Sequence, residues 1–72
     1  MQSTLGYSFI GKKFRNIKGE LCHVVNEFID DNEDIITYKK WSKRVLDWNY
    51  YTDYKELFMV QFKYGAKWIR NK

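Results

Sequence analysis

Residues 21–42 read LCHVVNEFIDDNEDIITYKKWS, and this stretch decides the fold. It consists of two runs rich in β-branched and aromatic residues, which favour strands, on either side of a turn-favouring DDNE cluster. We therefore predict a β-hairpin with strands at 21–29 and 34–42. Alternation places four residues on one face of the first strand: Cys22, Val24, Asn26 and Phe28. Because neither face is purely polar, we expect this strand near the middle of a curled sheet.

Further strands are predicted on both sides of this hairpin. Residues 45–51, VLDWNYY, alternate most clearly and would direct Leu46, Trp48 and Tyr50 toward the core. Residues 12–16 form a short alternating run, followed by a Lys-Gly pair that suits a tight turn. The chain therefore begins with four strands joined by three successive hairpins.

The end of the chain is open to two interpretations. Asp53 and Glu56 have the spacing of a capping box, which begins a helical turn. Beyond them, Phe58 and Phe62 fit a helical stripe with Leu57 and Gln61, but with Val60 they also fit one face of a strand. We predict one helical turn followed by a strand at 59–64, after which Gly65 begins a basic tail at 65–72.

This order of elements predicts a mainly β protein, a small SH3-like five-stranded antiparallel barrel with one helical turn. The barrel core would cover residues 12–64 of a single domain, 1–72. The alternative is an α+β domain, in which the capping box opens a full C-terminal helix laid across a four-stranded antiparallel sheet.

Several short motifs carry a resemblance to a known family. They are FRNIKG at 14–19, VV at 24–25, IITYK at 35–39, Trp48, and ELF at 56–58. Together they resemble a family of small uncharacterised bacterial and phage SH3-like domains, over residues 12–58. That family commonly has Trp-Val-Arg-Pro where this chain reads DWNY at 47–50, so no ligand site is carried over. The resemblance implies an SH3-like fold and a bacterial or phage source, and the family has no agreed activity.

Composition narrows the class of protein and of partner. The chain has 72 residues, of which 44% are hydrophobic and 19% aromatic, which argues against disorder and against a second domain. A net charge of +4 favours an anionic partner mildly. No run approaches the roughly 18 apolar residues of a membrane span, and Cys22 has no second cysteine to pair with. We therefore expect no membrane association and a cytoplasmic protein of a bacterial or phage-infected cell.

The groups that an enzyme would need are sparse. Cys22 and His23 are adjacent, so on a strand they point to opposite faces and cannot form a nucleophile–base pair. One Cys and one His are too few for zinc, and the acidic run 30–34 lacks the spacing of a calcium loop. The four glycines are too far apart for a phosphate-binding loop. We predict no catalytic residues, no metal and no cofactor.

Cations and aromatic rings make the binding candidates. Cations around a ring suit single-stranded nucleic acid, whereas Tyr and Trp also anchor protein interfaces. The candidate residues are Lys39, Lys40, Trp41, Lys43 and Arg44, with Tyr51 and Tyr54 near a strand end and Trp68 in the tail. The competing explanation is a solvated hairpin tip, with the rings packed beneath it. We expect a phage-encoded, non-enzymatic protein that binds a host protein stoichiometrically, with nucleic-acid binding as the alternative and a homodimer left open.

Overall fold

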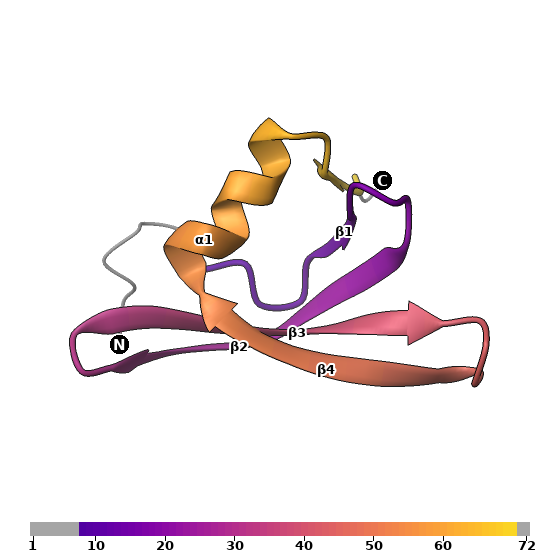
Figure 1. The fold of residues 1–72 in the computed structure, drawn as a ribbon. Coiled ribbons are helices and arrows are strands. Elements are labelled where there is room, and N and C mark those ends of the chain that lie inside the picture. Colours follow the sequence, from indigo (N-terminus) through magenta and orange to yellow (C-terminus); the bar gives the residue numbers. More distant parts are fainter. Residues whose placement is uncertain (1–7, 71–72) are drawn as a thin grey trace.

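A five-stranded antiparallel sheet and one short helix make up residues 8–70, the part of the chain that the structure, a computed structural model, describes (Figure 1). The elements are β1 (Lys13–Arg15), β2 (Leu21–Asp30), β3 (Glu33–Ser42), β4 (Asp47–Tyr54), α1 (Lys55–Val60), the 3-10 turn η1 (Gln61–Lys63) and β5 (Lys67–Trp68). The strand order is β4-β3-β2-β1-β5. The prediction of a mainly β, five-stranded antiparallel fold is therefore confirmed.

The first three strands lie where the sequence predicts them. The β2–β3 hairpin turns at Asp31 and Asn32, whose φ angles of 54° and 64° are those of the two-residue turns that match strand twist. Asp and Asn tolerate this left-handed conformation better than other side chains do. The β1–β2 turn uses Gly19, with a φ of 81°. Local turn chemistry thus fixes both hairpins.

A bulge in β2 makes the predicted alternation of its side chains wrong beyond Val24. Val24 pairs with Tyr38 but Asn26 pairs with Thr37, so Val25 is an extra residue in the ladder. Beyond the bulge the faces exchange, and Glu27 rather than Asn26 follows Val24 toward the core. Period-two reasoning missed this because it assumes an unbroken ladder.

The strand β4 begins at Asp47, two residues later than predicted, because residues 43–46 form a turn in which Leu46 has a φ of 55°. The predicted core face of this strand is also wrong. Leu46 is 72% exposed and Tyr50 65% exposed, while Trp48 is half-buried against another ring. Both faces of β4 carry rings, so alternation alone could not say which face meets the core.

The chain after β4 is helical through residue 63, so the predicted strand at 59–64 is wrong and the helical stripe is right at Phe58 and Phe62. The capping box is also wrong. Asp53 stays in β4, Tyr54 is the N-cap, and no side chain caps the helix. The fifth strand lies instead in the predicted basic tail, where Trp68 pairs with Phe14 of β1.

The core fills the space between α1, β1 and one face of the β2–β3–β4 sheet, which we call the inner face (Figure 1). Phe14 is fully buried and meets the Phe58 ring edge-on, with the ring centroids 5.2 Å apart. Trp68 stacks on Phe62 at 4.6 Å, with an interplanar angle of 12°. The predicted binding residue Trp68 therefore packs in the core.

The opposite, outer face of the β2–β3–β4 sheet is covered by no described helix or strand (Figure 1). Within residues 8–70 the two edge strands β4 and β5 do not pair with each other, so the sheet is not closed into a barrel. None of the described helices is long and apolar enough to cross a membrane. The surfaces open to a partner are thus the outer face, the sheet edges and the hairpin ends.

Candidate functional site

Strand alternation separates the cations that the sequence places side by side. Lys40 pairs with Cys22, which is fully buried, and so belongs to the inner face. Lys39 pairs with His23 and Tyr50 and belongs to the outer face. The predicted cluster of cations around Trp41 therefore divides into two surfaces, one on each side of the β3–β4 hairpin.

The first surface is a groove of about 760 Å³ on the inner side, between the β1–β2 turn and the β3–β4 hairpin. We call it the basic groove. Its charged lining residues are the cations Arg15, Lys18, Lys40, Lys43 and Arg44 and the carboxylate Glu20, and its other lining residues include Trp41, Asn49 and Tyr51. Five of the eight predicted site residues meet here, whereas Arg15, Lys18 and Glu20 come from a hairpin distant in sequence.

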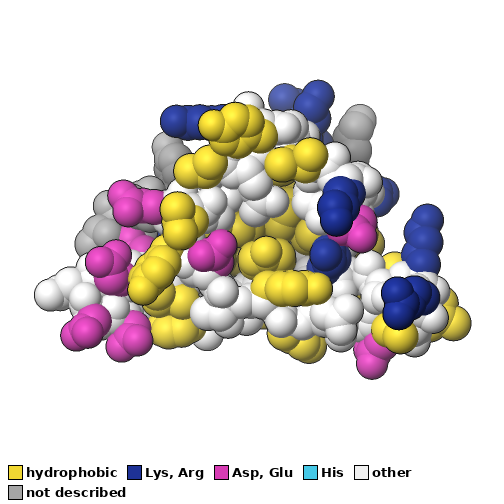
Figure 2. Space-filling view, viewed as in Figure 1, with side chains coloured by type: hydrophobic (Ala, Val, Ile, Leu, Met, Phe, Trp, Pro, Cys, Tyr) yellow, Lys and Arg dark blue, Asp and Glu magenta, His cyan; other side chains and the backbone are white. Residues whose placement is uncertain are grey.

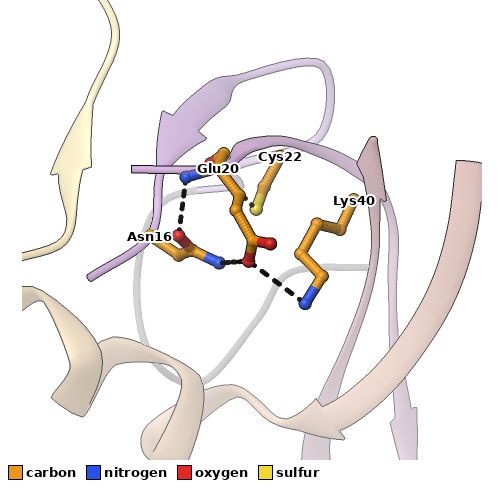
Figure 3. Close-up of polar contacts among 4 residues, drawn as sticks. All are labelled: Asn16, Glu20, Cys22 and Lys40. Carbon is orange, nitrogen blue, oxygen red and sulfur yellow. Dashed lines mark hydrogen bonds and ion pairs between the residues drawn. The ribbon is translucent and has the colours of Figure 1, made fainter. Parts of the chain in front are cut away.

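A polar network holds one wall of the basic groove (Figure 3). Asn16 Nδ2 donates to Glu20 Oε1 at 2.8 Å, and the Glu20 backbone N–H donates back to Asn16 Oδ1 at 2.8 Å. The same Glu20 oxygen lies 3.3 Å from Lys40 Nζ. The Asn16 hydrogen bond, followed by Lys40, lowers the pKa of the Glu20 carboxyl, so this group stays charged.

Lys40 is held between this carboxylate and a ring. Its Nζ lies 5.1 Å from the centroid of Tyr51, which stacks on Tyr38 of the core. Burial alone would lower the pKa of Lys40, but the hydrogen bond and charge of Glu20 outweigh it, so the pKa is raised. Lys40 is thus a fixed cation in the groove.

Cys22 lies beneath the groove and is fully buried. Burial raises the pKa of its thiol to about 11, and Sγ lies 3.5 Å from the Glu20 carbonyl oxygen. The group is therefore a neutral thiol at pH 7, in which form it is a poor nucleophile. His23, its neighbour in sequence, pairs with Lys13 and Lys39 on the other face, where alternation predicts it.

The second surface lies on the outer face at the basic end of the sheet. Cross-strand pairing forms a row from β1 to β4: Lys13, His23, Lys39 and Tyr50. Beside it Trp41 pairs with Trp48, with ring centroids 5.3 Å apart, and Lys39 Nζ lies 4.5 Å from the Trp48 ring centroid. We call these six residues the aromatic face.

Sequence reasoning missed most of the aromatic face. It assigned Trp48 and Tyr50 to the core and did not include His23 among the candidate binding residues. The pairing of β1 with β2 and of β3 with β4 brings these residues together, and such pairing is not visible in any local window. The signal that could have found Trp48 and Tyr50 is the four-residue turn at 43–46, since the register it sets places Tyr50 opposite Lys39 and Trp48 opposite Trp41.

The other end of the molecule is acidic (Figure 2). A hollow of about 560 Å³ is lined there by Asp30, Asp31, Glu33 and Asp53 together with Phe28, Ile35, Thr52 and Tyr54. The predicted site residue Tyr54, which is 50% exposed, therefore lies away from the cations. In residues 8–70 no group of three or more His, Cys, Asp or Glu side chains could hold a metal ion.

A buried ion pair on the inner face was also missed by the sequence. Lys55 Nζ lies 2.8 Å from Glu27 Oε1, and the side chains are only 1% and 9% exposed. Glu27 Oε2 also accepts a hydrogen bond from the Phe9 backbone N–H. The bulge at Val25 turns Glu27 inward, so this pair ties the start of α1 to β2.

Comparison with protein-family models, with curated proteins and with solved structures found no match to this chain. The candidate surfaces are therefore interpreted from their own geometry and charge.

Proposed function

We propose that this protein is a non-enzymatic binding protein that holds a polyanionic macromolecule in its basic groove. One observation carries the proposal: five cations from two hairpins line a groove that contains a single carboxylate. Such convergence of one sign of charge raises the local concentration of an anionic partner and steers its approach.

Most of these cations are available to a ligand. Of the five groove cations, Lys40 is ion-paired with a described carboxylate, that of Glu20. Lys18, Lys43 and Arg44 are exposed and form no ion pair with a described carboxylate. A polyanion would therefore gain these contacts without first breaking an internal ion pair.

The absence of a catalytic role is part of the proposal. It is supported by the separation of the nucleophile from a base, since the Cys22 thiol is buried on the inner face and His23 lies on the outer face. A binding protein needs no such convergence.

A protein partner, which the sequence placed slightly ahead of nucleic acid, is the second candidate. The observation that favours it is an apolar cross-strand row on the outer face at the acidic end, Phe28, Ile35 and Tyr54. Phe28 is 44% exposed and Tyr54 50% exposed, and aromatic residues of this kind anchor protein interfaces. The basic groove favours the polyanion because its charges converge, whereas the apolar row is small.

The finer architecture that we propose is the SH3-like barrel. The strand order β4-β3-β2-β1-β5, with α1 and η1 between β4 and β5, supports it. Barrel closure would pair the free edges of β4 and β5. Amide hydrogen exchange tests this, because closure would slow exchange along the outer edge of β4 and an open sheet would leave it fast.

Fluorescence anisotropy with labelled single-stranded DNA, duplex DNA and heparin, at two salt concentrations, tests the function. We expect micromolar or tighter binding that weakens as salt rises, with a log–log slope of about −2 if about three phosphates of a single strand are neutralised. Lys43→Ala/Arg44→Ala should weaken binding because it removes two groove cations from an exposed turn.

Lys63→Ala/Arg70→Ala is the matched control, because it removes the same charge from two exposed residues that do not line the groove. Equal losses for the two double variants would mean that net charge alone acts. No binding to any of these polyanions at low salt would overturn the proposed function and direct the search to a protein partner.

A further inference from the structure

We propose that the aromatic face is a binding track for single-stranded nucleic acid, in which bases stack on Tyr50 and the Trp48 edge while phosphates meet Lys39 and Lys13. This inference rests on the proposed function, since it takes the polyanion to be a nucleic acid. It adds a second surface, on the side of the β3–β4 hairpin opposite the basic groove.

The row of the aromatic face runs across four strands. Lys13, His23, Lys39 and Tyr50 lie on four adjacent strands, paired one to the next. Neighbouring strands are about 4.8 Å apart, so the row crosses the sheet over about 14 Å. Cations and a ring are thus spaced along the outer side of a curled sheet, over which no described helix or strand lies (Figure 1).

The aromatic face is positively charged where its lysines lie. Alternation and the bulge place four strand carboxylates on the inner face: Glu27, Asp34, Asp47 and Asp53. The remaining two, Asp30 and Glu33, pair with each other at the far end of the β2–β3 hairpin. No carboxylate of β2, β3 or β4 therefore lies on the outer face beside Lys13 or Lys39, and the complementary partner is anionic.

The aromatic rings of this face are placed where bases could stack. Tyr50 stands 65% exposed on the edge strand, beside the edge-on Trp41–Trp48 pair. Bases stack on such rings regardless of sequence, while cations beside them meet the backbone. Lys39 Nζ, 4.5 Å from the Trp48 ring centroid, would be desolvated at the centre of a protein interface, where Lys is depleted. The surface therefore fits a nucleic acid better than a protein.

His23 provides a reporter within the row. Burial, followed by the charges of Lys39 and Lys13, lowers the pKa of its imidazole, while a hydrogen bond to the Gly11 backbone opposes them. A phosphate bound between the two lysines would favour the protonated ring and raise this pKa. By linkage, binding should then tighten as the pH falls toward 6.

The experiment uses the full chain and a dye-labelled oligothymidylate of about a dozen nucleotides, with inorganic polyphosphate and a DNA hairpin duplex as competitors. Tyr50→Ala should weaken oligothymidylate binding about tenfold, since it removes one stacked base. Tyr50→Phe should bind like the wild type because it keeps the ring. Tyr64→Ala is the matched control, because Tyr64 is 71% exposed and lies outside both surfaces.

Two further readouts separate stacking from charge. Oligothymidylate should quench Trp41 and Trp48 fluorescence, whereas polyphosphate should not. The His23 pKa, followed by proton NMR, should rise when oligothymidylate is bound. A Tyr50→Ala variant that binds oligothymidylate like the wild type would overturn the inference, as would oligothymidylate that binds and leaves the tryptophan fluorescence unchanged.

The outcomes also distinguish this inference from the proposed function. If Lys43→Ala/Arg44→Ala weakens binding and Tyr50→Ala does not, the groove binds the polyanion and the aromatic face plays no part. If only Tyr50→Ala weakens binding, the aromatic face is supported and the groove is wrong. If no polyanion binds, both are wrong.

Discussion

Two lysine–glutamate pairs stabilise different parts of the same sheet, and their surroundings differ sharply. The Lys55–Glu27 pair is closed over by the core, with side chains 1% and 9% exposed and a contact of 2.8 Å. The Lys40–Glu20 pair borders an open groove, with side chains 26% and 39% exposed and a contact of 3.3 Å. The same chemistry therefore has two settings: the buried pair joins α1 to β2 inside the core, and the solvated pair holds a cation in the groove where we propose that a polyanion binds.

The largest expected loss of stability comes from removing the β2 bulge, which turns Glu27 toward Lys55. Deleting Val25 would remove the extra residue of β2 and turn Glu27 to the outer face. Lys55, which is fully buried, would lose that carboxylate, and breaking a buried pair costs about 3–5 kcal/mol. Since small domains are marginally stable, we expect a largely unfolded chain by circular dichroism and NMR.

A control for the deletion is Val25→Ala, which keeps the extra residue and removes only a half-buried side chain. It should remain folded and keep the Lys55–Glu27 pair. A folded, native-like deletion variant would show that the bulge does not set the direction of Glu27.

The next largest loss of stability is expected from changing the Glu27 carboxylate alone. Glu27→Gln should lower the free energy of unfolding by about 3 kcal/mol, because it replaces the carboxylate that lies 2.8 Å from the buried Lys55 Nζ by a neutral amide. Urea denaturation followed by tryptophan fluorescence measures this loss. The double variant Glu27→Gln/Lys55→Met should recover most of it, since it removes the buried lysine charge and keeps an amide oxygen that can accept from the Phe9 backbone N–H. A double variant less stable than Glu27→Gln would contradict the electrostatic explanation.

Some of the elements around the buried pair could be predicted from the sequence, and others could not. The β2–β3 hairpin was predictable because its β-branched strands and its turn are local signals. The direction of Glu27 was not, because a bulge is a property of two paired strands. Phe58 and Phe62 suit a helix and a strand equally within a short window, and packing on Phe14 and Trp68 decides for the helix.

The candidate binding residues also include some that a local run of sequence shows and some that only the folded sheet brings together. The cations of residues 39–44 are visible as a local run, and Lys40, Lys43 and Arg44 do line the basic groove. Arg15 and Lys18 come from the β1–β2 hairpin, and the cross-strand partners of Lys39 come from β2 and β4, so only the sheet brings them together. The two-residue strand β5 is too short to give any periodic signal.

The smallest expected effect is on the exposed pair. Glu20→Gln should change the midpoint of urea denaturation very little, because a solvated ion pair contributes little to stability. It should strengthen polyanion binding a few-fold, since it removes the one carboxylate that lines the basic groove. Anisotropy titration of labelled DNA against both proteins measures this, with Glu56→Gln, an exposed carboxylate outside the groove, as the matched control.

The pH dependence of this pair follows from the direction of its pKa shift. The Glu20 pKa is lowered from 4.5 in the folded protein, so its contribution to stability is present above pH 4.5 and is lost as the pH falls through the lower folded value. An NMR titration of the Glu20 side chain should therefore show a lowered midpoint in the wild type and a value near 4.5 in Lys40→Ala/Asn16→Ala. If the double variant keeps the lowered midpoint, the charge of Glu20 is set elsewhere, and the Lys40–Glu20 contact cannot be what positions the groove cation.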